Sequence, residues 1–192
     1  MRSYKQNNIP PRDRYNRPIS DLRVSLLDQC NFRCTYCMPE REFHSEYQFL
    51  KKYQRLSHEE IFRIVKIAVE LGVTKVRLTG GEPLLDKNIS KLINLISQVE
   101  EIEDLALTTN GVLLRKHAND MMKAGLHRIT ISLDSIDEVI FNKMNGNRAS
   151  VREVLDGIEA AENAGFDKIK INTVIKKGVN DDSIVSLLDH FR

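Results

Sequence analysis

The stretch CNFRCTYC, residues 30–37, contains all three cysteines of this 192-residue chain. Cys30, Cys34 and Cys37 follow a C-x-x-x-C-x-x-C spacing, which is too tight and too odd in number for a disulfide framework. Thiolates that converge from one loop make a soft-ligand site, which suits zinc or an iron–sulfur cluster. On a four-iron cluster, three cysteines leave one iron with an open position for a non-protein ligand. The loop therefore predicts a metal centre around which the rest of the chain is organised.

Two other interpretations use the same cysteines. Cys34 and Cys37 form a C-x-x-C pair, as in thioredoxin-like redox proteins, but this interpretation leaves Cys30 unexplained. A structural zinc bound by the three cysteines and His44 is a recognised ligand combination. The spacing alone leaves the zinc site open.

After the cysteine loop the sequence alternates between strand-like and helix-like runs. The clearest helix opens with the capping box Ser57…Glu60 and closes at Gly72. The expected strands are residues 21–27, 74–79, 104–110, 127–134 and 168–175, and the expected helices are residues 57–72, 89–99, 114–124 and 150–164, with a last one from residue 182. Strands that alternate with helices of this length predict an α/β fold with a parallel sheet and right-handed crossovers.

The expected strands alternate apolar and polar residues, whereas parallel strands covered on both faces usually read as continuous apolar runs. The polar set includes Arg23, Arg77, Thr108, Ser132 and Lys170. If the apolar set faces the helices, the polar set faces the inside of a curved sheet, where arginine and lysine need anionic partners. The pattern predicts a polar lumen that holds a negatively charged ligand. An open sheet whose polar face meets water is the alternative.

A second conspicuous turn, TGGEPLL at residues 79–85, follows the second expected strand. In a barrel, this end of a strand is where chemistry is done. Gly80 and Gly81 allow a ligand to approach the backbone closely, and Glu82 can accept a hydrogen bond from an ammonium group. Beside a cysteine loop, the turn points to a small zwitterion bound at the open iron.

Composition bears on the partners of the protein and on its cellular compartment. The chain has 29 basic and 27 acidic residues, which gives no argument for nucleic acid or an anionic membrane as partner. It shows no apolar run of membrane-spanning length and no signal-peptide core, and clustered thiols need a reducing compartment. We therefore expect a cytoplasmic protein. Residues 1–20 hold three prolines and five basic side chains against one acidic, so we expect a flexible basic arm there.

The motifs together resemble a known family. CNFRCTYC followed by TGGEP one βα unit later is similar to the radical S-adenosylmethionine (SAM) superfamily. Within it, the chain resembles in order and spacing the GTP 3′,8-cyclases, which begin molybdenum cofactor biosynthesis. The runs that carry the resemblance are DLRVSLLDQCNFRCTYCMP (21–39), VRLTGGEPLL (76–85), LTTNG (107–111), HRITISLDS (127–135) and KINTVIKKGVND (170–181). One departure is Gln29, where the family commonly has arginine.

The resemblance implies an incomplete, TIM-like (β/α) barrel of the radical SAM type, with five βα units in residues 21–192. It implies that Cys30, Cys34 and Cys37 hold a [4Fe-4S] cluster whose open iron chelates SAM. The positions implied to contact SAM are Tyr36, Gly80, Gly81, Glu82 and Ser132. Those implied to bind GTP are Arg23, Arg77, Thr108 and Lys170, all of which the alternation already placed on the polar face.

The implied reaction converts GTP to (8S)-3′,8-cyclo-7,8-dihydroguanosine 5′-triphosphate. A deoxyadenosyl radical from SAM takes hydrogen from C3′ of the ribose, and the new radical closes onto C8 of guanine. The family also carries a second [4Fe-4S] cluster in a C-terminal part, so we expect the 192 residues to be an N-terminal fragment that does not cyclise GTP alone. An external electron donor is implied. A homodimer, another radical SAM enzyme that modifies peptides, and a zinc-stabilised binding module remain open alternatives.

Overall fold

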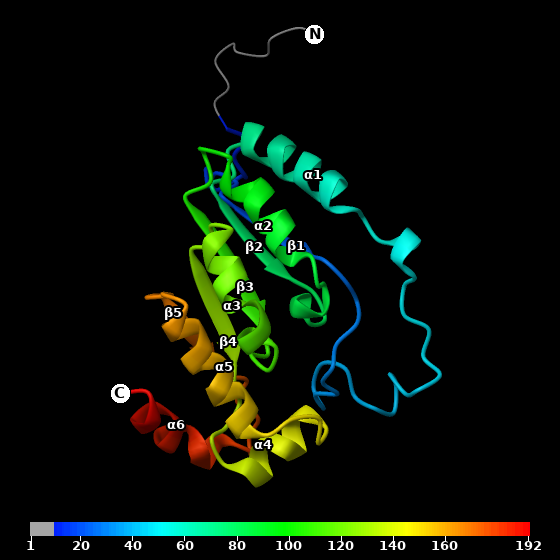
Figure 1. Cartoon of the computed structure of the whole chain (residues 1–192), viewed down its shortest axis with the longest axis vertical. Helices are drawn as coiled ribbons and strands as arrows, with labels where there is room; N and C mark the ends of the chain where they lie inside the picture. Colours follow the sequence, from blue (N-terminus) through cyan, green and yellow to red (C-terminus); the bar gives the residue numbers. More distant parts are fainter. Residues whose placement is uncertain (1–9) are drawn as a thin grey trace, which may run out of the picture.

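A computed structural model describes residues 10–192 of the chain (Figure 1). Its centre is a parallel sheet in the order β1-β2-β3-β4-β5, in which each strand lies beside its neighbour in the sequence. The strands are β1 Asp21–Ser25, β2 Lys75–Thr79, β3 Asp104–Thr109, β4 Arg128–Ser132 and β5 Ile169–Asn172. β1 and β5 are the two edges and do not pair with each other in the described residues, so the sheet is open. The predicted α/β fold, a parallel sheet that stops short of a closed barrel, is confirmed.

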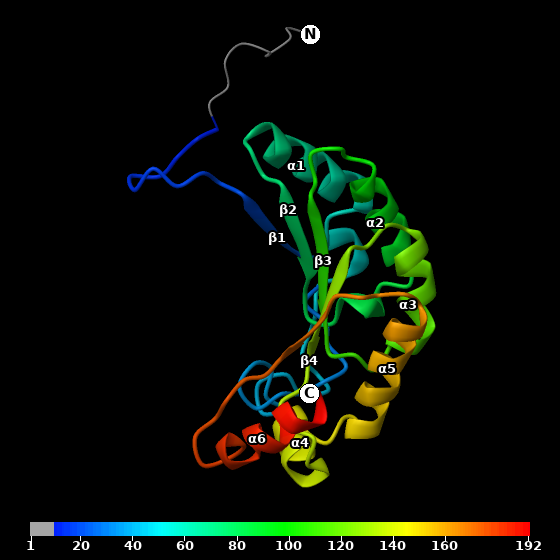
Figure 2. The same cartoon turned by 90° about the vertical axis from the view of Figure 1, so that its left-hand side faces the viewer.

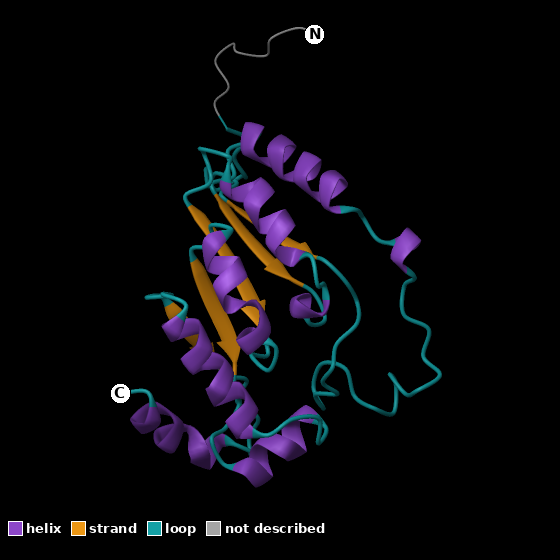
Figure 3. Cartoon of the chain, in the orientation of Figure 1, coloured by secondary structure: helices purple, strands orange, loops and turns teal. Residues whose placement is uncertain are grey.

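Helices follow every strand (Figure 3). They are α1 His58–Glu70, α2 Ile89–Ser97, α3 Leu114–Lys123, α4 Glu138–Asn145, α5 Val151–Asn163 and α6 Ile184–His190, with short 3₁₀ turns η1 Lys52–Gln54, η2 Pro83–Leu85 and η3 Asp181–Ser183. The predicted capping box of α1 is present, because Ser57 Oγ accepts from the Glu60 amide at 3.2 Å and Glu60 Oε2 accepts from the Ser57 amide at 2.8 Å. Gly72 ends this helix with φ at +102°, a conformation that favours glycine.

Four helices, α1, α2, α3 and α5, cover one face of the sheet (Figure 2). The strand residues that face them are apolar, and neighbours in the register stack into continuous rows. Leu78 lies opposite Leu107, and Leu107 lies opposite Ile129, with each side chain 0% exposed. Burying a leucine or isoleucine completely contributes about 1.5–3 kcal/mol relative to leaving it exposed. This face is the hydrophobic core of the domain.

The opposite face of the sheet carries the polar set, as the alternation predicted. Arg23 lies opposite Arg77 in the register, and in the next row Thr130 lies opposite both Thr108 and Lys170. No described helix covers this face (Figure 2). Arg23 and Lys170, on the edge strands, are exposed, so the expectation that arginine and lysine are buried in a polar lumen is wrong for these two residues. Toward the centre of the same face Arg77 is partly buried and Thr130 is 5% exposed, so the alternative of a polar face that meets water describes the edges of the sheet.

The sequence interpretation missed α4. Its first turn is capped by Asp137, whose Oδ1 accepts from the amides of Val139 and Ile140 at 2.9 Å each, and its end is marked by Gly146 at φ +78°. With α6, the helix lies beyond the carboxyl ends of the strands (Figure 1). Both capping signals were readable, but they fall between the fourth expected strand and the next expected helix, in residues 135–149, to which the sequence interpretation assigned no element.

One further segment differs from the prediction, and another lies partly outside the described residues. β5 ends at Asn172 rather than at residue 175, because Thr173 Oγ1 turns to donate to the Leu133 carbonyl at 2.8 Å. The expected flexible arm, residues 1–20, lies in part outside the described residues, and from residue 10 onward it contains an antiparallel bridge between Arg12 and Pro18. Across residues 10–192, none of the helices is long and apolar enough to cross a membrane.

Candidate functional site

The cysteine loop lies at the carboxyl-terminal end of the sheet, where the ends of β3 and β4 meet it. Asn110, the first residue after β3, donates through Nδ2 to Asn31 Oδ1 at 2.7 Å. Asp134, two residues after β4, accepts from the Tyr36 hydroxyl at 2.7 Å. The loop is therefore held across two neighbouring strand ends, the position where parallel α/β sheets carry their sites.

The TGGEP turn is joined to the loop by backbone contacts. The Gly81 amide donates to the Leu27 carbonyl at 2.7 Å, and the Glu82 amide donates to the Gln29 carbonyl at 2.8 Å. A Cβ on Gly81 would lie 2.0 Å from the Gln29 oxygen, and a Cβ on Gly80 would lie 2.8 Å from the Leu27 oxygen. The group that approaches these glycines is thus the chain's own backbone next to Cys30. Their contacts with SAM stay a prediction.

Glu82 is 1% exposed and braces the turn against the end of β3. Its Oε1 accepts from the Thr109 hydroxyl at 2.7 Å and from the Leu84 amide at 3.0 Å, and its Oε2 accepts from the Asn110 amide at 2.8 Å. Burial raises the pKa of this carboxyl, while these three donors act in the opposite direction. Glu82 therefore fixes the relative positions of two strand ends, and its expected contact with an ammonium group stays a prediction.

Cys30 and Cys34 are partly buried and pack against the hydrophobic core, whereas Cys37 is exposed. Burial raises the pKa of the Cys30 thiol to about 11 and that of the Cys34 thiol to about 12. At neutral pH these thiols are therefore protonated in the metal-free chain. Binding of a metal releases these protons, because only the thiolate is a ligand.

The three cysteines do not converge on one point. Within residues 10–192, no group of three or more His, Cys, Asp or Glu side chains is placed to hold a single metal ion. On a four-iron cluster each thiolate binds a different iron, so the sulfurs need not meet at one point. Three soft donors on one loop, two of them packed on apolar side chains, fit such a cluster.

The remaining predicted residues spread from this loop onto the polar face. Tyr36 is half-exposed, and burial of its hydroxyl end beside Asp134 raises its pKa. Ser132 ends β4 and lies opposite Asn172 in the register. Arg77 is partly buried on β2, one row from Thr108 on β3. The structure joins Tyr36, Gly80, Gly81 and Glu82 to the loop region and leaves Ser132 and the GTP candidates on the polar face of the strands.

The sequence interpretation missed three residues of this site, namely Asn31, Asn110 and Asp134. Asp134 is 7% exposed, its Oδ1 accepts from the Val174 amide at 2.9 Å, and burial raises its pKa. The available signal was position, because Asn110 and Asp134 are the polar last residues of two expected strands, 104–110 and 127–134. A separate cavity of about 980 Å³ lies between η1, the start of α1 and η2, and none of the predicted site residues lines it.

Comparison with known proteins gives close relatives over nearly the whole chain. A protein of Xanthomonas axonopodis pv. citri named GTP 3′,8-cyclase is 50% identical over 183 residues, which cover 95% of this chain and 54% of that protein. A protein of Staphylococcus haemolyticus with the same name is 48% identical over 181 residues, which cover 94% of this chain and 53% of that protein. The chain thus spans about half the length of the curated relatives it matches.

Among solved structures, SuiB of Streptococcus suis, determined with SAM bound, has the same fold. Its TM-score is 0.70 at 21% sequence identity, and the match covers 88% of this chain and 37% of that one. Residues 24–191 also match the family described as the radical SAM superfamily. With a match from the first strand to the last helix, the chain belongs to the radical SAM superfamily, whose chemistry implies a [4Fe-4S] cluster and SAM.

Proposed function

We propose that residues 21–192 form the radical SAM domain of a GTP 3′,8-cyclase, which converts GTP to (8S)-3′,8-cyclo-7,8-dihydroguanosine 5′-triphosphate at the start of molybdenum cofactor biosynthesis. The observation that carries the proposal is identity of 47–50% over at least 94% of the chain with relatives of that name. The proposed SAM residues Tyr36, Gly80, Gly81 and Glu82 lie in or against the cysteine loop, and the proposed GTP residues lie on the polar face of the sheet, which supports the proposal.

In this proposal Cys30, Cys34 and Cys37 hold the [4Fe-4S] cluster. The bound cluster, once reduced, supplies the electron that cleaves SAM. Tyr36, Gly80, Gly81, Glu82 and Ser132 surround the SAM. The chain's own contribution is position, since Glu82 and Asp134 tie the TGGEP turn and Tyr36 to the strand ends. No side chain of the described residues is assigned a proton transfer.

The GTP candidates fit an elongated anion laid across the open face. Arg23 and Arg77 share one row of the register, and Thr108 and Lys170 share the next, about 6.6 Å further along the strands at two residues of about 3.3 Å each. The outer strands lie about 19 Å apart, at about 4.8 Å per strand spacing. Arg23 and Arg77, side by side on β1 and β2, suit phosphate groups, since charge-assisted bonds to phosphate are strong, whereas Lys170 lies on the opposite edge strand, β5.

The proposal also includes components that residues 21–192 do not themselves provide. A second [4Fe-4S] cluster is proposed for a further portion of the protein, in keeping with relatives about twice as long as the chain. An external reductant is needed for the first electron. A homodimer is compatible with the proposal and not required by it, and a cytoplasmic location stays a prediction from the clustered thiols.

The test compares two proteins after anaerobic reconstitution with iron and sulfide. One is the 192-residue chain, and the other is a longer chain in which these residues replace the matching part of the Xanthomonas relative. Each is reduced with dithionite and incubated with SAM and GTP, and the products are separated by chromatography. We expect deoxyadenosine from both proteins and the cyclised nucleotide from the longer one alone. A longer chain that cleaves SAM without consuming GTP would overturn the assignment.

The peptide-modifying alternative is not favoured. Likeness to SuiB at 21% identity is evidence for the shared fold alone. A peptide-modifying enzyme need not keep Arg23, Arg77 and Lys170 as a phosphate site. Running the same assay once with GTP and once with a peptide separates the two, because a cyclase given GTP makes deoxyadenosine in proportion to a cyclised nucleotide and leaves the peptide unchanged.

A further inference from the structure

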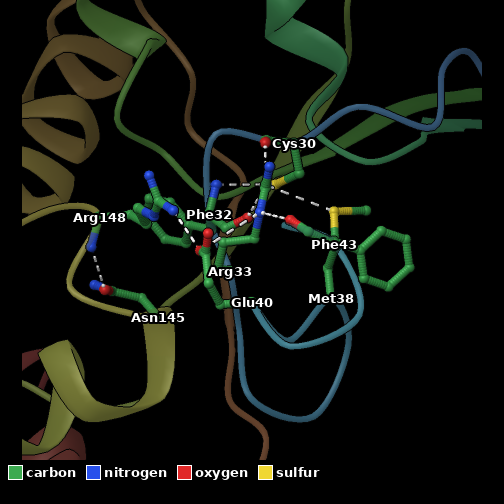
Figure 4. Close-up of polar contacts among 8 residues, drawn as sticks. All are labelled: Cys30, Phe32, Arg33, Met38, Glu40, Phe43, Asn145 and Arg148. Carbon is green, nitrogen blue, oxygen red and sulfur yellow. Dashed lines mark hydrogen bonds and ion pairs between the residues drawn. The ribbon is translucent and has the colours of Figure 1, made fainter. Parts of the chain in front are cut away.

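Arg33 lies between the first two cysteines, and the proposed function assigns it no role. Its side chain is 14% exposed. The guanidinium donates through Nε to the Phe43 carbonyl at 2.8 Å, and through Nη1 to the carbonyls of Cys30 and Phe32, also at 2.8 Å each (Figure 4). One side chain therefore satisfies backbone acceptors that lie at both ends of the segment from residue 30 to residue 43.

The charge of this guanidinium is balanced within the same loop. Glu40 Oε2 lies 3.8 Å from Arg33 Nε and also pairs with Arg148, which follows α4 (Figure 4). A buried arginine needs an anionic partner, and Glu40 is the carboxylate that pairs with Arg33 among the described residues. Through Glu40, the loop is connected to the turn between α4 and α5.

The backbone of the loop docks on the end of α4. The Arg33 amide donates to the Asn145 carbonyl and the Thr35 amide donates to the Met144 carbonyl, at 3.0 Å each. A Cβ on Gly146 would lie 2.6 Å from the Arg33 oxygen, so glycine is needed for this approach. Asn145, 2% exposed, holds the helix end by accepting from the Arg148 amide at 2.9 Å and donating to the Ala149 carbonyl at 2.8 Å.

We propose that Arg33 is a positioning residue that shapes the cysteine loop before iron binds, because its side chain joins both ends of residues 30–43 and thereby keeps the backbone amides of Arg33 and Thr35 in place to bond the end of α4. The inference rests on the proposed assignment of the three cysteines as cluster ligands. All the contacts that carry it are between protein atoms, so none of them requires the cluster. A lysine cannot replace this fork, because its ammonium group is compact and lacks the planar spread of donors.

The test uses four forms of the 192-residue chain, namely wild type, Arg33→Ala, Arg33→Lys and the control Arg41→Ala. Arg41 is an arginine of the same loop, with a side chain 83% exposed that pairs only with its neighbour Glu42 among the described residues. Each form is reconstituted, and loss of iron to a chelator is followed by the fading of the visible absorption. We expect iron loss to be about tenfold faster in Arg33→Ala, the lower end for residues that orient metal ligands. The rate of iron loss from Arg33→Lys should lie between those of wild type and Arg33→Ala, and Arg41→Ala should lose iron at the wild-type rate.

A second measurement needs no iron. In the metal-free wild-type chain, the Arg33 and Thr35 amides should exchange hydrogen at least about tenfold more slowly than in Arg33→Ala, while the amides of α5 exchange alike in both. If Arg33→Ala does not fold, iron loss from Arg33→Lys tests the inference in its place. Wild-type iron retention by Arg33→Lys, or unprotected Arg33 and Thr35 amides in the wild-type chain, would overturn the inference. Failure of the wild-type chain to take up a four-iron cluster would instead overturn the proposed function.

Discussion

The two faces of the sheet have different roles, because one forms the hydrophobic core and the other carries candidate ligand-binding residues. On the covered face, Leu78, Leu107 and Ile129 are completely buried beneath helices. On the open face, Arg23 and Lys170 reach solvent, although they occupy the same strands and the same kind of register rows. Alternation along a strand thus separates stability from ligand binding within single elements. Substitutions on one face should change the free energy of unfolding, and those on the other face and at its carboxyl end should change what the chain binds.

The largest expected effect is at the carboxyl end of the sheet. Replacing Cys30, Cys34 or Cys37 with alanine, one at a time, should abolish or severely reduce four-iron incorporation, because each thiolate holds a separate iron. The check is iron and sulfide per chain after reconstitution. Thermal unfolding of the metal-free variants should stay close to wild type, most clearly for the exposed Cys37. Unchanged iron content in all three variants would remove the cluster from this loop.

The second effect belongs to the covered face. Leu107→Ala should lower the free energy of unfolding by about 2–5 kcal/mol, through lost burial and a residual cavity. Its neighbour Thr108 supplies the matched control, because Thr108→Val changes the open face and should cost less than about 0.5 kcal/mol. Urea unfolding of the metal-free chain measures both. Equal losses at the two positions would contradict the division between the faces.

The difference between the faces also explains what the sequence could predict. Period-two alternation and capping boxes are local patterns, so both faces and the box at Ser57 and Glu60 were predictable. The contacts of the site are not local. Tyr36 and Asp134 are 98 residues apart, and Asn31 and Asn110 are 79 residues apart, so these pairs become visible only once the strands are placed side by side. Alternation along the strands is the same in an open sheet and in a closed barrel. It could therefore not predict that no layer of the described residues covers Arg23 and Lys170.

The third effect is on ligand binding by the open face. Arg77→Ala in the longer chain that carries the rest of the Xanthomonas relative should weaken GTP binding at least about tenfold, as a charged hydrogen bond is worth about 1.5–3 kcal/mol. SAM binding should change little. Arg115 on α3, 68% exposed and paired with Asp156, is the control, and Arg115→Ala should leave GTP binding unchanged. Equal loss of GTP and SAM in Arg77→Ala would indicate misfolding, and no loss of GTP affinity would remove Arg77 from the site.

The smallest effect comes from an ion pair on the open face, at the amino ends of β3 and β4. Arg128 donates through Nε and Nη2 to the two carboxylate oxygens of Asp104 at 2.7 and 2.6 Å, with both side chains about three-quarters buried (side-chain exposure 26% and 23%). The hydrogen bonds from Arg128 lower the pKa of Asp104 and outweigh the opposing effect of its burial.

A carboxyl whose pKa is lowered by folding contributes stability that is present above its unfolded pKa, about 3.9, and is lost as the pH falls through its folded pKa. Asp104→Asn should therefore cost about 1 kcal/mol at pH near 7, the upper end for an exposed ion pair, because this one is bidentate and partly shielded. The cost should shrink as the pH falls below about 4, where Asp104 of the unfolded wild-type chain binds a proton that the folded chain does not yet bind. Urea unfolding of the metal-free chain across this range measures the difference, with Asp156→Asn at the more exposed pair as the control. A cost that stays constant from neutral pH to below the folded pKa would show that packing, rather than the charge of Asp104, stabilises this end of the open face.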